Sequence, residues 1–486
     1  MHLKFGQIVK FHLIKNTRYE ILSMKTINIL GNNFASLILA NKLAEKKIKV
    51  RLFLDGQRAG GHFAGIKQEN CLFDIGMTFL EKPSTTKNID KNFTQFAPNR
   101  HYDWVRYGEL VAREVDEIFS PILAQVPKVV YDNQLFSDYL IANDMELMRY
   151  FDIKLANNPQ KYRHMMHAKF KNKNKEFRTI DFETASIFNN GYDIHNLMIM
   201  PFLKKITKVN PNKFEAKFHR VLWVPLFWPE TIHDFLKFGK VKLENYKFFS
   251  PSNGTIAEVV RLLEENLRKM KNVEVLDSAI ENATYEYGEF SMYCDNREYH
   301  VTLDSIGTSL DRFCALFKLK KPQILDREDL VFGFFLVDRK YAHLLDFSVL
   351  NVVDSAYKVY RVSNQGICKV SGHVKLCLEG NLDLLTNYGD EVPLEEKFLD
   401  EFTKIFKLPY ESVSKKTVVK AMNTLKLPTF SNIKAYEQKV KEIHNTFCVE
   451  TLTGGLLGYN LTSLNDQIAQ ALKQYHQIYH TLRVNK

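Results

Sequence analysis

A short apolar strand that runs into a glycine turn and then a helix constrains this chain more than any other feature. The strand is predicted over residues 26–30, the turn over 31–34 and the helix over 35–46. A second apolar strand follows at 48–54. A strand, a helix and a strand joined this closely form a βαβ unit, whose crossover is normally right-handed. We therefore expect a parallel strand pair covered by a helix.

The turn of this unit has features of a dinucleotide-binding site. Gly31 permits the sharp turn, and a helix N-terminus offers N–H groups and a positive dipole to a pyrophosphate. Asn33 and Ser36 stand at the other two glycine positions; Asn tolerates positive φ, and Ser is small. Asp55 follows the second strand, near where an acidic residue would bind a ribose hydroxyl. Taken singly, the segment fits an ordinary βαβ unit nearly as well.

Further motifs follow in a fixed order along the chain. They are Gly60-Gly61-His62, Phe73-Asp74-Ile75-Gly76, Pro251-Ser-Asn-Gly254 before a helix predicted over 255–270, and Gly458–Asp466 before a helix predicted over 463–482. In this order the motifs resemble those of the FAD-dependent amine oxidase, protoporphyrinogen oxidase and UDP-galactopyranose mutase group. The matching segments cover about a third of the chain and lie towards both ends. Because chance matches rarely keep their order, the order favours a shared fold.

The resemblance implies an α/β fold. In it, an FAD/NAD(P)-binding Rossmann-like domain is built from both chain ends and carries an inserted α+β substrate domain. It implies FAD as cofactor, with contacts from Gly31, Asn33, Phe34, Ser36, Asp55, Gly60, Gly61, His62, Ala279, Gly458, Tyr459 and Asn465. His62 stands where the family often has Arg or Asn, and Val449-Glu450 stands near its usual Gly-Glu.

The same resemblance divides the chain into six segments. They are an N-terminal arm (1–24), a first FAD-binding segment (25–84), a helical substrate region (85–245), a second FAD-binding segment (246–310), the sheet and helices of the substrate domain (311–445) and a C-terminal FAD-binding segment (446–486). We expect the arm to be dispensable to the fold, because Met24 directly precedes the first convincing strand.

Several residues outside the fingerprint are candidates for substrate binding. Arg220 could bind a carboxylate or phosphate, and Trp223 could form an aromatic wall with Phe227 and Trp228, although clustered aromatics more often form core. Arg361 lies in a segment resembling one where mutase-like relatives meet substrate phosphate; a surface or sheet-edge arginine is the stronger interpretation. The basic run 161–178 could face an anionic substrate, but such runs are usually solvated surface.

Bulk properties exclude some classes of protein. The chain has 486 residues and a formal charge of +11, yet no nucleic-acid-binding motif. It lacks a long apolar run and a secretory signal, and its six scattered cysteines predict reduced, mostly buried thiols in the cytoplasm. His164 and His167 have helical spacing but no further ligands, so we expect no metal site.

These patterns together predict an FAD-dependent oxidoreductase acting on an unidentified small molecule, which could be anionic. A flavin-using isomerase similar to sugar-nucleotide mutases is an alternative. A cofactor-poor binding protein and a protein that binds NAD(P) instead stay open as well. No GxSxG or Walker sequence is present, and no catalytic base can be named.

Overall fold

The computed structural model describes residues 25–82, 101–140, 146–150, 180–224, 247–252, 254–387, 391–447 and 449–484. The chain divides into two compact units. Unit 1 comprises residues 1–64, 260–322 and 437–486, and unit 2 comprises residues 65–259 and 323–436. Unit 1 thus combines segments from both chain ends, and unit 2 is inserted between them. The division into six segments stays a prediction.

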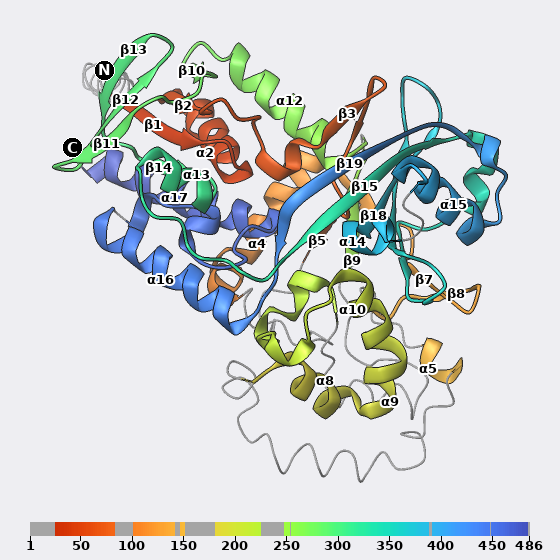
Figure 1. The fold of residues 1–486 in the computed structure, drawn as a ribbon. Coiled ribbons are helices and arrows are strands. Elements are labelled where there is room, and N and C mark those ends of the chain that lie inside the picture. Colours follow the sequence, from red (N-terminus) through yellow and green to blue (C-terminus); the bar gives the residue numbers. More distant parts are fainter. Residues whose placement is uncertain are drawn as a thin grey trace, which may run out of the picture. The chain divides into compact units, whose positions relative to one another are not determined.

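A four-stranded parallel sheet forms the centre of unit 1 (Figure 1). Its strands are β10 (Val273–Leu276), β2 (Lys49–Phe53), β1 (Thr26–Gly31) and β14 (Ser305–Gly307), in that order across the sheet. Helix α2 (Phe34–Glu45) connects β1 to β2, which confirms the predicted βαβ unit. β1 is apolar and almost wholly buried, as expected for a strand covered on both faces.

The rest of unit 1 is an antiparallel meander and several helices. The meander contains β11 (Ala283–Glu286), β12 (Glu289–Cys294) and β13 (Arg297–Val301), and the helices include α13 (Leu310–Leu316) and α17 (Leu464–Val484). α17 packs against α2. The sequence of residues 298–305 by itself predicts one strand, and this prediction is wrong, because the chain leaves the meander after Val301 and β14 joins the parallel sheet instead.

Two helices have residues in both units. One is α12 (Ile256–Lys269), which matches the helix predicted over 255–270, and the other is α16 (Phe430–Thr446), which agrees with the helical pattern of residues 431–445.

A seven-stranded sheet forms the core of unit 2. Its order is β19 (Val413–Lys426), β15 (Arg327–Val337), β18 (Val374–Asn381), β17 (Val359–Ile367), β16 (Val349–Val352), β7 (Lys128–Tyr131) and β8 (Gln134–Ser137). All neighbouring strands are antiparallel except β16 and β7. Successive residues of β17 point to opposite faces. Val359 lies in a cluster with Phe398, and Tyr360 packs edge-on against Phe202 with ring centres 6.2 Å apart.

Smaller elements surround this sheet. They are the hairpin β3 (Ile66–Gln68) and β4 (Cys71–Phe73), the sheet of β5 (Leu80–Lys82), β9 (Lys247–Pro251) and β6 (Pro121–Leu123), and the helices α4 (His101–Phe119), α5 (Glu146–Tyr150), α8 (Phe182–Asn190), α9 (Tyr192–Ile194), α10 (Met200–Ile206), α14 (Leu382–Thr386) and α15 (Leu394–Phe406), with a π-helix at His195–Ile199. None of the helices in the described ranges is both long enough and apolar enough to cross a membrane.

One pair of cysteines corrects the expectation of reduced thiols. Cys71 and Cys368 form a disulfide with Cα atoms 6.1 Å apart, although 297 residues separate them in sequence. The pairing depends on β4 lying near the end of β17, which residue spacing could not indicate. Cys294, Cys314 and Cys377 are buried thiols as predicted, and Cys448 lies outside the described residues.

Candidate dinucleotide-binding site

The glycine turn of unit 1 is shaped first by a neighbouring strand. Gly31 has φ 145° and pairs with Gly307 at the end of β14. A Cβ atom on Gly31 would lie 2.2 Å from the carbonyl oxygen of Gly307. A side chain is therefore excluded at this position by the fold itself, before any ligand is considered.

Side chains of the protein cap the N-terminus of α2. Asn33 is the N-cap, and its Oδ1 accepts a hydrogen bond of 2.9 Å from the backbone N–H of Ser36. The N–H of Ala35 donates to Oε1 of Gln467 over 3.2 Å, and Asn33 Nδ2 donates to Oγ1 of Thr453 over 3.1 Å. The first-turn N–H groups of Ala35 and Ser36, which a pyrophosphate would use, thus have acceptor oxygens within the chain.

The second glycine motif lies beside this cap. Gly60 forms an isolated bridge with Asn33, and both Gly60 (φ 88°) and Gly61 (φ 58°) have left-handed backbone. A Cβ on Gly60 would lie 2.3 Å from Cγ1 of Val260, whereas the nearest atom to a Cβ on Gly61 is 3.8 Å away. A side chain at Gly61 would therefore make only ordinary van der Waals contacts with the turn, and what favours glycine there is the left-handed backbone.

His62 and Phe34 flank this arrangement. His62 belongs to a 3₁₀ turn at Gly61–Ala64, and its side chain is exposed to solvent. Surrounding protein atoms still desolvate the imidazole, which lowers its pKa. Phe34 is buried and packs edge-on against Phe63, with ring centres 6.0 Å apart.

Asp55, the candidate ribose ligand, is engaged within unit 1. Its side chain is only 2% exposed, and Oδ1 accepts a 2.8 Å hydrogen bond from the N–H of Ile280. Nε and Nη2 of Arg312 each bind one carboxylate oxygen over 2.5 Å, and this pairing raises the pKa of the arginine. Ala279 lies against Gly56, so the predicted adenine-side segment does meet the end of β2.

The C-terminal motif reaches the turn through α17. Gly458 follows a short 3₁₀ turn, and the N–H of Tyr459 donates to Glu437 Oε1 over 2.9 Å. Asn465 is buried in the first turn of α17, two residues before Gln467. The structure therefore connects this motif to α2 through Gln467, a residue that the sequence interpretation omitted.

The candidate substrate residues lie in unit 2 and are already in contact with protein. The Arg220 guanidinium lies over the Trp223 ring, 5.7 Å from its centre. Arg361 is 4% exposed, and its Nη1 lies 3.3 Å from Oε2 of Glu379. Several residues and segments singled out in the sequence lie outside the described residues: Phe227, Trp228, His164, His167, the basic run 161–178 and the arm 1–24.

The sequence analysis did not identify three residues that contact the turn or Asp55: Gln467, Thr453 and Arg312. All three lie far from these contacts in sequence, and local residue spacing gives no indication of Thr453 or Arg312. Gln467 had one available signal: with Gln470 and Gln474 it places amides at i, i+3 and i+7 along one face of a helix, and all three are buried.

Comparisons with known proteins bear on the fold. No protein-family model and no curated protein matches the chain. Among solved structures, a protein provisionally named protoporphyrinogen oxidase from Exiguobacterium sp. 255-15 is similar, with a TM-score of 0.60 and 14% identity over 95% of this chain and 100% of that one. A reduced UDP-galactopyranose mutase gives 0.60 and 13% over 94% of each chain. Cyclohexylamine oxidase from Brevibacterium oxydans gives 0.55 and 10% over 94% of this chain and 99% of that one.

These similarities cover nearly the whole chain at low identity, and they therefore concern its fold. The parallel sheet of unit 1, and the assembly of that unit from both chain ends, agree with the predicted Rossmann-like architecture. The chain thus shares its fold with these solved proteins, as the order of its motifs had indicated.

Proposed function

We propose that this chain is an FAD-dependent oxidoreductase that acts on a small molecule. The proposal is carried by one juxtaposition in unit 1: the N-terminus of α2, the left-handed backbone at Gly61 and the acidic end of β2 belong to a single compact unit. Structural neighbours named as oxidases, which share this fold over nearly their full length, support it.

We infer that the backbone of this unit can accommodate a dinucleotide. Three side chains of the protein now make the hydrogen bonds that the polar atoms of a dinucleotide would make. Oε1 of Gln467 and Oδ1 of Asn33 stand in for phosphate oxygens, because each accepts from a first-turn N–H group. Arg312 holds Asp55, which would otherwise accept from ribose hydroxyls. We infer that FAD binding displaces Gln467 and loosens Arg312.

The roles of the remaining predicted residues follow from the same proposal. Ala35 and Ser36 would donate to the pyrophosphate, and the segment at Ala279 would flank the adenine. Gly458, Tyr459 and Asn465 would lie by the flavin ring and ribityl chain. When bound, the flavin supplies the electron acceptor, and the protein supplies orientation and exclusion of water. A mutase-like isomerase would use the same site with reduced flavin.

A second candidate is a cofactor-free binding protein of the same fold. One observation favours this candidate. The N–H groups of α2 and the Asp55 carboxylate, which FAD would contact, already form hydrogen bonds with Asn33, Gln467 and Arg312. In a cofactor-free protein, Asn33 and Gln467 would cap the N-terminus of α2 permanently.

Titration of the flavin-free protein with FAD separates the two candidates. We expect uptake of FAD, read from flavin fluorescence polarisation and from visible absorbance after removal of unbound cofactor. Gln467→Ala removes the competing acceptor, so FAD should bind roughly two- to tenfold more tightly, the equivalent of one hydrogen bond.

Gln470→Ala is the matched control. Gln470 lies one turn further along α17 and is equally buried, but its Oε1 accepts from the N–H of Gly454 instead of α2. This variant should leave the FAD affinity unchanged. If neither the wild-type chain nor Gln467→Ala takes up FAD, the flavoenzyme proposal fails and the cofactor-free candidate stands.

A further inference from the structure

Unit 2 contains a pocket of about 490 Å³ whose lining includes none of the residues proposed to contact FAD. Its walls come from the segments 74–79, 122–125, 250–255, 342–349 and 363–374. All of these belong to unit 2, so the pocket is defined within that unit alone. Its volume suits a small organic molecule, and such pockets usually combine an apolar lining with a few polar groups that fix orientation.

One buried hydroxyl group in the wall has no partner among the described residues. The hydroxyl of Ser363, on β17, lacks a hydrogen bond within the described structure, although the residue is only 4% exposed. Buried hydroxyl groups are nearly always satisfied, so an orphan in a pocket wall calls for an explanation. A ligand group that both accepts and donates, such as an alcohol, would satisfy it.

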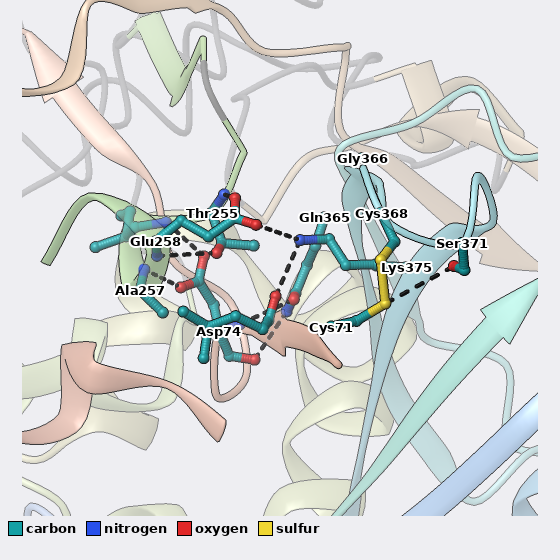
Figure 2. A network of polar contacts seen from close by, with 12 residues as sticks. Cys71, Asp74, Thr255, Ala257, Glu258, Gln365, Gly366, Cys368, Ser371 and Lys375 are labelled. Atoms are coloured by element: carbon teal, nitrogen blue, oxygen red, sulfur yellow. Dashed lines mark hydrogen bonds and ion pairs between the residues drawn. A yellow bond between two sulfur atoms is a disulfide. The ribbon is translucent and has the colours of Figure 1, made fainter. Parts of the chain in front are cut away.

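The acidic residue of the wall is not available to a ligand. The carboxylate of Asp74 accepts a 2.8 Å hydrogen bond from the N–H of Ala257 (Figure 2). It also accepts a 3.1 Å hydrogen bond from the N–H of Ile256 and one from Oγ1 of Thr78. The amide of Gln365 is likewise engaged with the backbone of Asp74 on both sides. Among the described lining residues, the pocket therefore offers no free carboxylate to a cationic amine.

A cation is available instead. Lys369 lines the same pocket, is exposed, and has no hydrogen bond or ion pair with any other described residue. Apolar side chains, among them Met77, Leu345 and Val349, form other stretches of the wall. The described lining thus presents a buried hydroxyl without a partner, an unpaired ammonium group and an apolar surface.

We propose that this pocket binds a hydroxylated organic anion, with an alcohol group on Ser363 and the anionic group on Lys369. The site is inferred from unit 2 alone, so binding does not require FAD. That the ligand is also the substrate rests on the proposed oxidoreductase function.

Ligand-detected NMR and calorimetry on the full-length chain test the ligand class. Gluconate represents hydroxylated anions, glucose lacks the charge, and putrescine represents amines. We expect gluconate to bind, glucose to bind at least several-fold more weakly, and putrescine not to compete. Equal or tighter binding of putrescine, or no binding of gluconate, overturns the proposal.

Two pairs of variants test the residues. Ser363→Ala should weaken gluconate binding roughly three- to tenfold, the effect of one hydrogen bond, without lowering the unfolding temperature. Ser412→Ala is its control, because Ser412 is also a buried, unpartnered hydroxyl in unit 2 but does not line the pocket. Lys369→Gln should abolish the preference for gluconate over glucose, whereas Lys420→Gln, an exposed lysine of β19, should not.

The results also separate this site from the proposed function. FAD uptake without gluconate binding overturns the ligand class alone. Gluconate binding without FAD uptake, lost in Ser363→Ala, supports this site and removes the oxidoreductase function. Equal affinities in Ser363→Ala and Ser412→Ala would show that the orphan hydroxyl does not contact the ligand.

Discussion

Asp55 shows how a single residue combines a structural and a proposed binding role. Its carboxylate is buried and joins three separate regions of unit 1: the end of β2, the backbone at Ile280 and the first turn of α13 through Arg312. A buried charge is tolerated only when it is paired and hydrogen-bonded, and Asp55 meets both conditions.

Arg312→Ala should destabilise the flavin-free protein, because it leaves the Asp55 carboxylate buried without its counter-ion. Breaking a fully buried pair typically costs about 3–5 kcal/mol, and since Arg312 is one-third exposed we expect about 1–3 kcal/mol. Urea denaturation measures the change. Arg51→Ala, which removes a more exposed pair with Glu274, should cost less than about 1 kcal/mol.

Lys205 gives unit 2 a predictable pH dependence. Its ammonium donates to the carbonyl oxygens of Val352 and Asp354, and burial lowers its pKa from 10.5 to about 7, partly offset by Glu401 and Asp354. Between these values the unfolded chain binds more protons than the folded one. The free energy of unfolding therefore rises with pH over this range, by at most about 1.4 kcal/mol per pH unit.

Lys205→Met should remove this contribution. The stability difference between wild type and variant should shift by about 1–2 kcal/mol in favour of the wild type from pH 7 to pH 9. Chemical denaturation at several pH values checks this, and parallel profiles would show that the burial of Lys205 does not perturb its titration.

At the scale of elements, a row of glutamines fastens α17 to the rest of unit 1. Gln467 binds the N–H of Ala35, Gln470 binds the N–H of Gly454, and Gln474 accepts from Ser305 and donates to the carbonyl oxygen of Leu452. Each side chain satisfies backbone or hydroxyl groups that α17 would otherwise bury unpaired. α17 therefore stabilises unit 1 by side-chain hydrogen bonds as well as by apolar packing.

The disulfide makes a second connection between elements, joining β4 to the end of β17 in unit 2 (Figure 2). A cross-link that closes a long loop typically stabilises a protein by about 2–4 kcal/mol. A dithiol reductant should therefore lower the unfolding temperature of the wild type and expose two additional thiols after denaturation. The Cys71→Ser/Cys368→Ser variant should be insensitive to reductant; an equal response in both proteins would exclude this pair as the cause.

At the scale of the whole molecule, the contribution of both chain ends makes unit 1 non-local. The strand that begins at Thr26 pairs with one that begins at Ser305, and α2 is covered by the last helix of the chain. Neither end can complete the parallel sheet and its cover without the other.

Deleting residues 463–486 should therefore unfold unit 1 selectively. Hydrogen exchange is expected to show lost protection in β1 and β14, while β15 and β18 of unit 2 keep theirs. A chain that begins at Met24 is the control and should retain both patterns, since β1 begins at Thr26. Loss of protection in both units would mean that they fold as one cooperative block.

Local sequence determined much of this protein by itself. Apolar runs and helical spacing were sufficient for β1, α2, α12 and α17, because periodicity and turn chemistry act over a few residues. The order of the glycine motifs was sufficient to predict the fold, because each motif occurs at a defined position in the topology of that fold. The composition of the turn also indicated that its fingerprint departs from the usual glycines.

Only the tertiary structure decided what those departures do. Gln467 meets Ala35 across 432 residues, and Arg312 meets Asp55 across 257. The same holds for Cys71 with Cys368 and for the orphan hydroxyl of Ser363 in its pocket. Partners of this kind depend on which distant segments the sheets bring together, and residue spacing carries no record of that. The sequence could therefore locate the candidate cofactor turn, but only the folded chain determined which atoms occupy it.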